Sequence, residues 1–342
     1  MDGDPVAALR HELARHPRDS VLLARAHLAL GSIESARCAY RSEPRANEEA
    51  AQLELLVAQW LDHPMRLAHL FAPPPPVVRT DGTGTVVTYL SPDGIAEIAV
   101  TVFPRPALRG ICLYFHGNAE DARDCASLAP LWHSRGLALA VVEPRGYGCS
   151  SRQSPTLTAL LSDSEPLVTS AETLQKIAAV AAADHLQTLP PLFVFGRSLG
   201  CHCAVHCCAL AAAHDQPNWA AGLILDSGVA SVRHWQAVLP DDDGGAADGR
   251  PGVPGDLRTI GLLENLGKLR GIHRASDPPI PALILHGSRD EIVPPFQAEL
   301  LKQCLPAARL ELIEGRGHND LSCAPRYSEA VSCFVSELLG DA

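Results

Sequence analysis

The sequence has 342 residues, more than one average domain, and its hydrophobic fraction of 46% and charged fraction of 20% are typical of a globular protein. The net charge of −11, with no basic cluster to offset it, argues against nucleic acid or an anionic membrane as a partner. The acidic N-terminus lacks the features of a signal peptide, and no segment is long and uncharged enough to span a bilayer. We therefore expect a cytoplasmic protein without a transmembrane segment.

Residues 1–72 are predicted to form a small helical appendage. Apolar side chains such as Leu9, Leu13 and Leu30 recur at near-helical spacing, and Gly31 is a typical helix stop. Residues 17–44 resemble one tetratricopeptide-like helix pair, but one repeat cannot bury a continuous core. We expect the appendage to pack on the following domain or to bind a protein partner. A Pro/Gly-rich linker over residues 73–84 is predicted to separate the two.

Eight strand-like runs follow within residues 85–342, which are expected to form one α/β domain. The first two runs flank a Ser-Pro-Asp-Gly turn, which predicts an antiparallel pair at the edge of a sheet. From residue 111 onward a helix-length segment separates each strand from the next. This alternation predicts a mostly parallel eight-stranded sheet with helices on both faces. The runs are residues 86–90, 98–103, 111–115, 137–143, 192–195, 222–225, 282–285 and 310–313.

A break in the alternation predicts a small cap or flexible insert at about residues 228–275. Residues 240–255 are rich in Asp, Gly and Pro and show no periodicity. Only residues 257–269 are suited to a helix in this region. Such a small cap favours an open site over a deep lipid tunnel.

The run at residues 192–195 ends in the pentapeptide Gly-Arg-Ser-Leu-Gly and is followed by a helix-compatible segment. A strand, a sharp turn with a serine between glycines, and a helix together expose one hydroxyl at the end of a sheet. Ser198 is therefore the candidate nucleophile. An aliphatic hydroxyl needs a base to take its proton, so the pattern requires partners elsewhere in the chain.

Two later strands supply those partners in the order that such a site requires. Asp290 follows the strand at residues 282–285, and His318 follows the strand at residues 310–313. We expect His318 to be the base and Asp290 to orient it. Asp226 also ends a strand and is the alternative acid.

The strand at residues 111–115 leads into a glycine-containing turn, His-Gly-Asn-Ala. Backbone N–H groups at such a turn can converge on the negative charge that develops on an acyl oxygen. The predicted oxyanion-hole donors are the backbone amides of Asn118 and Leu199, the latter being the residue after the nucleophile.

These motifs together resemble the serine hydrolases of the α/β-hydrolase superfamily, and most closely the Bem46-like subgroup, which includes eukaryotic depalmitoylases. The resemblance covers residues 85–339 and implies hydrolysis of an ester, thioester or amide through an acyl-enzyme. The depalmitoylating members carry a cysteine-rich, lipidated N-terminus, whereas the first cysteine here is Cys38, so a palmitoyl-protein substrate and a membrane location do not carry over. The motifs are residues 116–119, 145–148, 196–200, 286–290 and 317–320.

The resulting prediction is a serine hydrolase that cleaves a carboxylic ester or thioester of a small-molecule or acylated substrate, with no cofactor and no metal. The alternatives are a serine peptidase or amidase on the same fold, or a catalytically idle interaction protein. The residues 201–208, Cys-His-Cys-Ala-Val-His-Cys-Cys, could suggest a metal site. We interpret them instead as helix positions that pack on the sheet, where cysteine behaves as a small hydrophobe.

Three further side chains in these motifs had open roles. His116 is expected to brace the oxyanion turn through a hydrogen bond rather than act as a base. Arg145 could anchor a loop through Asp124 or Glu120, or could contact substrate. Arg197 could favour an anionic substrate or could bind a neighbouring backbone carbonyl.

Overall fold

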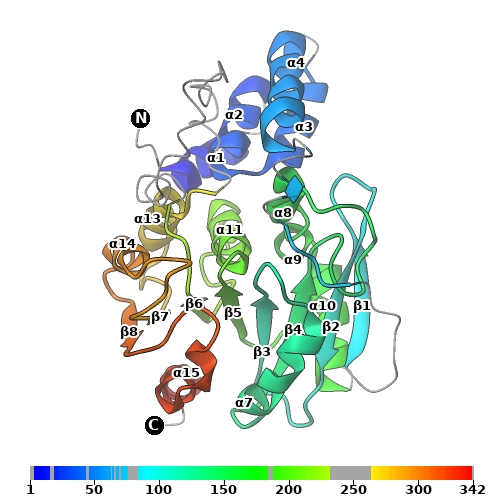
Figure 1. Ribbon diagram of the computed structural model, residues 1–342. Helices are drawn as coiled ribbons and strands as arrows, with labels where there is room; N and C mark the ends of the chain where they lie inside the picture. The colour runs from blue at the N-terminus through cyan, green and yellow to red at the C-terminus, as the bar shows by residue number, and fades with distance from the viewer. Residues whose placement is uncertain are drawn as a thin grey trace.

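The computed structural model describes residues 4–15, 19–43, 46–62, 64, 67–68, 71–75, 84–183, 188–231 and 263–340. In this part of the chain an eight-stranded sheet has helices on both faces, and helices from the N-terminus form a further layer on one side (Figure 1). The mostly parallel sheet and the N-terminal helices expected from the sequence are confirmed.

The strand order is β1-β2-β4-β3-β5-β6-β7-β8. Strand β2 is antiparallel to both of its neighbours, and the pairs from β4 to β8 are all parallel. All eight predicted strands are present. Their bounds are β1 Thr85–Leu90, β2 Glu97–Phe103, β3 Gly110–Phe115, β4 Leu137–Glu143, β5 Leu192–Arg197, β6 Gly222–Asp226, β7 Ala282–Gly287 and β8 Arg309–Ile313.

The helices divide the interior into two apolar cores, one on each face of the sheet. Helices α6 (Ala122–Cys125), α7 (Ala129–His133) and α15 (Pro325–Leu339) cover one face. The other face is covered by α8 (Leu157–Ser162), α9 (Pro166–Thr169), α10 (Ala171–Ala182), α11 (Gly200–Ala213), α13 (Asn265–Ala275) and α14 (Phe296–Cys304).

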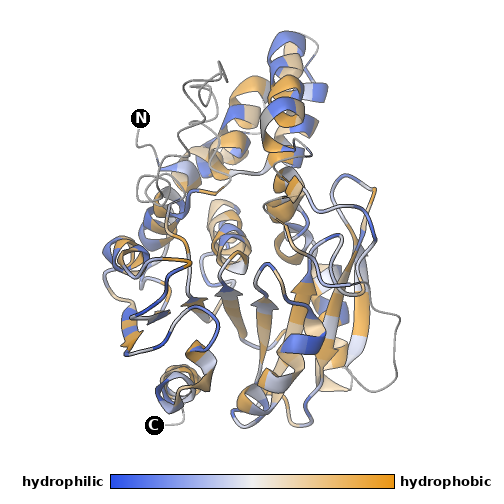
Figure 2. Cartoon of the chain, in the orientation of Figure 1, coloured by the Kyte–Doolittle hydropathy of each residue, from blue (hydrophilic) through white to orange (hydrophobic). Residues whose placement is uncertain are grey.

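The central strands are apolar over most of their length because both of their faces are covered. Every residue of β3 and β4 is buried. Figure 2 shows the hydrophobic colour running through the middle of the sheet. A parallel sheet buried on both faces produces continuous apolar runs rather than alternation, which is why these strands could be located from the sequence.

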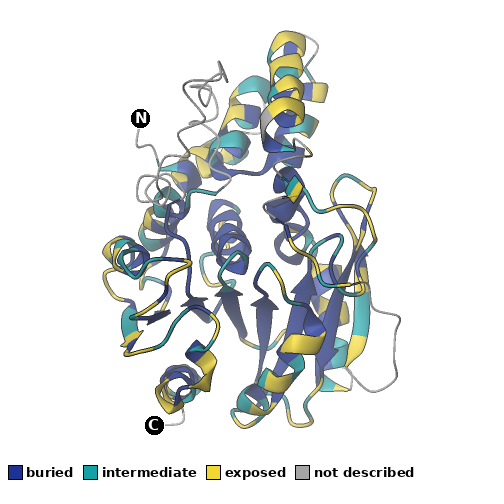
Figure 3. Cartoon of the chain, viewed as in Figure 1, coloured by how far each residue is buried: buried dark blue, intermediate teal, exposed yellow. Residues whose placement is uncertain are grey.

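The N-terminal helices α1 (Pro5–Ala14), α2 (Ser20–Leu30), α3 (Ile33–Arg41) and α4 (Asn47–Leu56) lie outside the helices that cover the sheet. Helix α1 contacts α11 and α13, and α3 contacts α8. As a result all residues of α11 are buried, which Figure 3 shows as a uniformly dark helix. The Asp19 side chain caps the start of α2, and Gly31 ends the same helix at φ 93°.

The predicted insert at about residues 228–275 falls mostly on residues 232–262, which lie outside the described residues. The helix predicted over residues 257–269 is wrong in its bounds, because α13 begins at Asn265 and ends at Ala275. Gly267 and Gly271 weaken the helical signal in the sequence. A Cβ at Gly271 would lie 2.6 Å from the Val6 side chain, so close packing against α1 accounts for that glycine.

The predicted linker over residues 73–84 is described only at residues 73–75 and 84. Within the described ranges, no helix combines the length and apolar character needed to cross a bilayer.

Candidate active site

Ser198 lies in the sharp turn between β5 and α11. Its backbone adopts φ 50°, in the left-handed region, and its N–H donates to the carbonyl oxygen of Asp226 at 2.8 Å. The turn needs glycine on both sides. A Cβ at Gly196 would lie 2.6 Å from the Cα of Cys201, and a Cβ at Gly200 would overlap the carbonyl oxygen of Phe115. The local sequence therefore allows a strained turn that holds the hydroxyl at the carboxyl edge of the sheet.

The structure brings Ser198, His318 and Asp290 together from the ends of β5, β8 and β7. Nε2 of His318 lies 2.9 Å from the hydroxyl oxygen of Ser198. Nδ1 of His318 lies 2.7 Å from Oδ2 of Asp290. A carboxylate can only accept, so Nδ1 carries the proton and Nε2 can accept the proton of the hydroxyl. This is the geometry of a general base aligned on a nucleophile.

The Asp290 carboxylate is fixed from several sides. Its Oδ1 accepts the backbone N–H groups of Ile292 at 3.0 Å and Val293 at 2.8 Å. Burial alone would raise the pKa of Asp290, but the hydrogen bonds from His318 and from the Val293 amide lower it below its usual value. The carboxyl group is therefore held in the charged form that can orient the imidazole.

Asp226, the alternative acid, has different partners. Its carboxylate accepts the hydroxyl of Tyr327 at 3.0 Å and the hydroxyl of Ser227 at 2.9 Å. Burial raises the pKa of Asp226. The geometry places Asp290, rather than Asp226, against the imidazole of His318.

The predicted oxyanion turn, residues 116–119, is held in place on both sides. The Asn118 side-chain oxygen accepts the Tyr147 hydroxyl at 2.8 Å, and the Gly117 N–H donates to Oε2 of Glu120 at 2.7 Å. The first residue of α11, Gly200, packs on the carbonyls that precede this turn. The backbone of Leu199 therefore lies beside the turn that carries Asn118.

His116 has the bracing position expected for it. Its Nδ1 donates to the Gly117 carbonyl oxygen at 2.8 Å, and its ring lies 5.3 Å from the Tyr147 ring. The His116 ring therefore contacts Gly117, which belongs to this turn, and Tyr147, whose hydroxyl binds Asn118 of the same turn.

The partners suggested for Arg145 are wrong. Its guanidinium pairs with Asp163 at 2.6 Å and with Asp93 at 2.8 Å, and it contacts neither Asp124 nor Glu120. Asp163 lies at the end of α8, and Asp93 lies in the turn between β1 and β2. Arg145 therefore anchors the loop after β4 to the edge of the domain, because the fold brings two carboxylates there from distant segments.

Arg197, by contrast, binds a backbone carbonyl as one interpretation proposed. Its Nη2 donates to the carbonyl oxygen of His318 at 3.0 Å and to Oδ1 of Asn319 at 3.0 Å. Its Nη1 lies 2.6 Å from Oε1 of Glu120. The sequence did not reveal Glu120 as the partner, because the pairing depends on how two loops meet in the fold.

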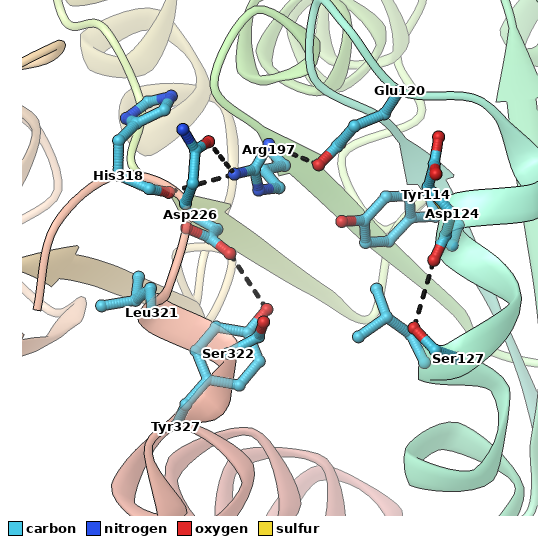
Figure 4. A pocket seen from close by; sticks show the side chains of 13 residues that line it. Tyr114, Glu120, Asp124, Ser127, Arg197, Asp226, His318, Leu321, Ser322 and Tyr327 are labelled. Carbon is cyan, nitrogen blue, oxygen red and sulfur yellow. Dashed lines mark hydrogen bonds and ion pairs between the residues drawn. The ribbon is translucent and has the colours of Figure 1, made fainter.

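Two cavities adjoin these residues. A polar cavity of about 100 Å³ is lined by Arg197, Asp226, Tyr114 and Tyr327, and the Tyr114 hydroxyl points into it (Figure 4). Ser198 is not among the residues that line it. A second, mainly apolar pocket of about 10 Å³ lies beside the predicted oxyanion turn, and its lining side chains come from Phe115, His116, Val142, Pro144, Tyr147, Leu160, Leu199 and Cys203.

The cysteines of α11 are all buried and pack in the core, as expected for small apolar side chains. Burial raises the pKa of Cys207 to about 12. His206 lies 3.1 Å from the carboxylate of Glu165. Within the described ranges, no three His, Cys, Asp or Glu side chains converge as metal ligands.

Comparison with known sequences identifies related proteins. Residues 106–240 match the family model described as serine aminopeptidase, S33. Protein bem46 of Schizosaccharomyces pombe is 26% identical over 241 residues, which are 68% of this chain and 69% of that protein. An uncharacterized membrane protein of Saccharomyces cerevisiae is 26% identical over 204 residues, which are 59% of this chain and 62% of that protein.

Solved structures share the fold at low sequence identity. A highly thermostable carboxyl esterase from Bacillus coagulans superposes with a TM-score of 0.52 at 15% identity, covering 75% of this chain and 98% of its own. A thermophilic esterase from Thermogutta terrifontis superposes with a TM-score of 0.51 at 19% identity, covering 75% of this chain and 94% of its own. A puromycin-hydrolyzing peptidase of Mycobacterium tuberculosis superposes with a TM-score of 0.51 at 18% identity, covering 75% of this chain and 40% of its own. These likenesses concern the fold.

Proposed function

Because the chain belongs to the α/β-hydrolase superfamily, as a Bem46-like member, we propose that it is a serine hydrolase that cleaves a carboxylic ester or thioester through an acyl-enzyme. The observation that carries the proposal is the continuous chain of hydrogen bonds from Ser198 through His318 to Asp290. Nothing in this reaction requires a redox group, since acyl transfer only moves protons and an acyl group.

The proposed reaction begins when the Ser198 hydroxyl oxygen attacks the acyl carbon. Nε2 of His318 accepts the hydroxyl proton and later returns it to the leaving alcohol or thiol. Asp290 keeps Nδ1 protonated and stabilises the imidazolium that forms. The backbone amides of Asn118 and Leu199 bind the oxyanion, and water then releases the acyl group by the reverse proton movements.

A peptidase is the second candidate, favoured by the family model described as a serine aminopeptidase. Peptidases of the prolyl-oligopeptidase kind select peptides with a large N-terminal propeller or an extended cap, whereas the N-terminal elements described here are the short helices α1 to α4. Hydrolysis rates for a panel of short peptides and for acetyl and decanoyl p-nitrophenyl esters distinguish a peptidase from an esterase. Turnover of peptides alone would favour the peptidase.

The test of the proposal is the Ser198→Ala variant. We expect it to lose both labelling by a fluorophosphonate probe and hydrolysis of p-nitrophenyl acetate, because the hydroxyl nucleophile is gone. Its melting temperature should stay near that of the wild type, since the backbone turn is retained. Ser328→Ala, a change on the exposed surface of α15, serves as the matched control and should keep full activity. Labelling that persists in Ser198→Ala would refute the proposal.

A further inference from the structure

Arg197 contacts all three segments that form the candidate active site. It is the residue immediately before Ser198, so its backbone belongs to the nucleophile turn. Its Nη2 donates to the His318 carbonyl oxygen and to Asn319 Oδ1, both at 3.0 Å. Its Nη1 pairs with Oε1 of Glu120 at 2.6 Å. One guanidinium therefore joins the nucleophile turn, the loop after β8 and the loop after β3.

Glu120 extends this link to the oxyanion turn. Its second oxygen, Oε2, accepts the N–H of Gly117 at 2.7 Å. Gly117 precedes Asn118, whose amide is a proposed oxyanion donor. A Cβ at Gly117 would lie 2.6 Å from Nη1 of Arg197, so the ion pair packs directly over this part of the backbone. The orientation of the peptide next to Asn118 thus depends on Glu120, and through it on Arg197.

The ion pair is partly shielded from solvent, which strengthens its hydrogen bonds. Arg197 and Glu120 side chains are 15% and 24% exposed. Burial alone would lower the pKa of Arg197, but the carboxylates of Glu120 and Asp226 outweigh it and raise the pKa. Charge-assisted hydrogen bonds in such a place are shorter and stronger than neutral ones. Arginine also suits this position because its planar fork can donate to separate acceptors at the same time.

Figure 4 shows how the pair is placed. Arg197 lies between Glu120 and the loop of His318, and the carbonyl of His318 faces Arg197 while its imidazole points away. The guanidinium therefore holds the backbone of His318 and leaves the ring free to face the serine.

We propose that Arg197 and Glu120 are positioning residues that hold the His318 loop and the oxyanion turn in the correct relation to Ser198. The inference rests on the proposed function, because the aligned groups act only in acyl transfer. It differs from a role in binding substrate, because Arg197 acts through Glu120 and the loop of His318 rather than on the acyl group.

The experiment compares Arg197→Met, Arg197→Lys and Glu120→Gln with the wild type in hydrolysis of p-nitrophenyl acetate. We expect Arg197→Met to lower kcat by on the order of 100-fold with KM little changed, since small misplacements of catalytic groups cost about that much. Arg197→Lys keeps the positive charge but loses the forked guanidinium, so its kcat should lie between those of the wild type and Arg197→Met. Glu120→Gln should lower kcat in the same way as Arg197→Met but by a smaller factor.

Two controls separate positioning from general damage. Arg326→Met removes an arginine whose side chain is 60% exposed and which pairs with Glu311, and it should leave kcat unchanged. Circular dichroism gives the folded fraction of each variant, and rates are corrected for it. The proton on Nδ1 of His318 should give a downfield NMR resonance in the wild type that is weakened in Arg197→Met.

Several results would overturn the inference. Wild-type kcat in Arg197→Met would do so, as would a rise in KM confined to anionic esters, which would make Arg197 a substrate-binding residue. A loss of kcat fully explained by the folded fraction would also overturn it. Failure of the proposed function looks different: the wild type itself would then show no Ser198-dependent hydrolysis.

Discussion

Asp226 and Asp290 both follow strands of the sheet, and their side chains differ in what they contact. The Asp290 carboxylate accepts a hydrogen bond from Nδ1 of His318 at 2.7 Å, whereas the Asp226 carboxylate accepts hydrogen bonds from the hydroxyls of Tyr327 and Ser227. The two carboxylates therefore have different hydrogen-bond partners. The sequence left both open as the acid, because each ends a strand at the same edge.

At the residue scale we predict that Asp290→Asn lowers kcat for p-nitrophenyl acetate by about 10⁴-fold, because an amide no longer stabilises the imidazolium or fixes the protonated Nδ1. The matched change Asp226→Asn keeps an oxygen that can accept the Tyr327 hydroxyl, so its kcat should stay close to that of the wild type. Steady-state kinetics of the two variants checks this. The reverse ranking would assign the acid to Asp226.

The roles of Ser198, Asp290 and His318 could be proposed from the sequence because each follows a recognisable strand and the chain order is distinctive. The partners of Arg145 could not be inferred in this way. Asp93 and Asp163 reach it from the β1–β2 turn and from the end of α8. Ion pairs depend on where loops meet in space, and spacing along the chain does not encode that.

At the scale of elements, the nucleophile turn depends on the fit between the start of α11 and the end of β3. Gly200 lies where any side chain would collide with the carbonyl oxygens of Phe115 and His116. Helix α11 can begin directly after Leu199 only because Gly200, its first residue, has no Cβ. The position of the Leu199 amide is a consequence of that contact.

We predict that Gly200→Ala displaces α11 from β3 and lowers kcat at least as strongly as it lowers the melting temperature. Gly267→Ala in α13 is the matched control, since its Cβ would find ordinary contacts from 3.4 Å. That variant should keep its activity and gain up to about 1 kcal/mol in the free energy of unfolding from helix propensity. Kinetics and thermal unfolding test both. A fully active Gly200→Ala enzyme would show that the close packing is not needed.

The buried parallel strands could be predicted because they are nearly continuous apolar runs in the sequence. The start of α13 could not. Two glycines interrupt its helical pattern, and contacts with α1 and α11 hold it instead.

Over the whole molecule, the N-terminal helices bury charged and titratable groups against the sheet-covering helices. His27 of α2 is 8% exposed and lies near Glu165 and His206. Burial lowers the pKa of His27 from 6.5 to about 4, although the Glu165 carboxylate opposes the change. The unfolded chain therefore binds a proton at His27 between about pH 6.5 and pH 4, while the folded chain does not. Folding stability must fall as the pH falls through that window.

We predict that His27→Gln reduces this pH dependence. The wild type should lose about 2 kcal/mol of unfolding free energy through His27 between pH 7 and pH 5, and the variant should lose correspondingly less. His11→Gln, at an exposed position in α1, is the matched control and should keep the wild-type pH dependence. Denaturant unfolding at the two pH values measures the difference. Equal pH dependence in wild type and His27→Gln would contradict the prediction.

The sequence patterns did not predict how the N-terminal helices cover α11. Helical spacing located α2 and its end at Gly31, but it left open whether the appendage packs on the domain or on a partner. The packing depends on side chains of α1, α11 and α13 that meet only in the folded chain.

Whether Ser198 forms the covalent intermediate is tested by locating the adduct in the sequence. The folded wild-type protein is treated with a fluorophosphonate, digested and sequenced by tandem mass spectrometry. We expect one modified residue, Ser198, and the same site for an acyl group trapped from p-nitrophenyl acetate at low pH. An adduct on another residue, or no adduct on folded protein that hydrolyses the ester, would contradict it.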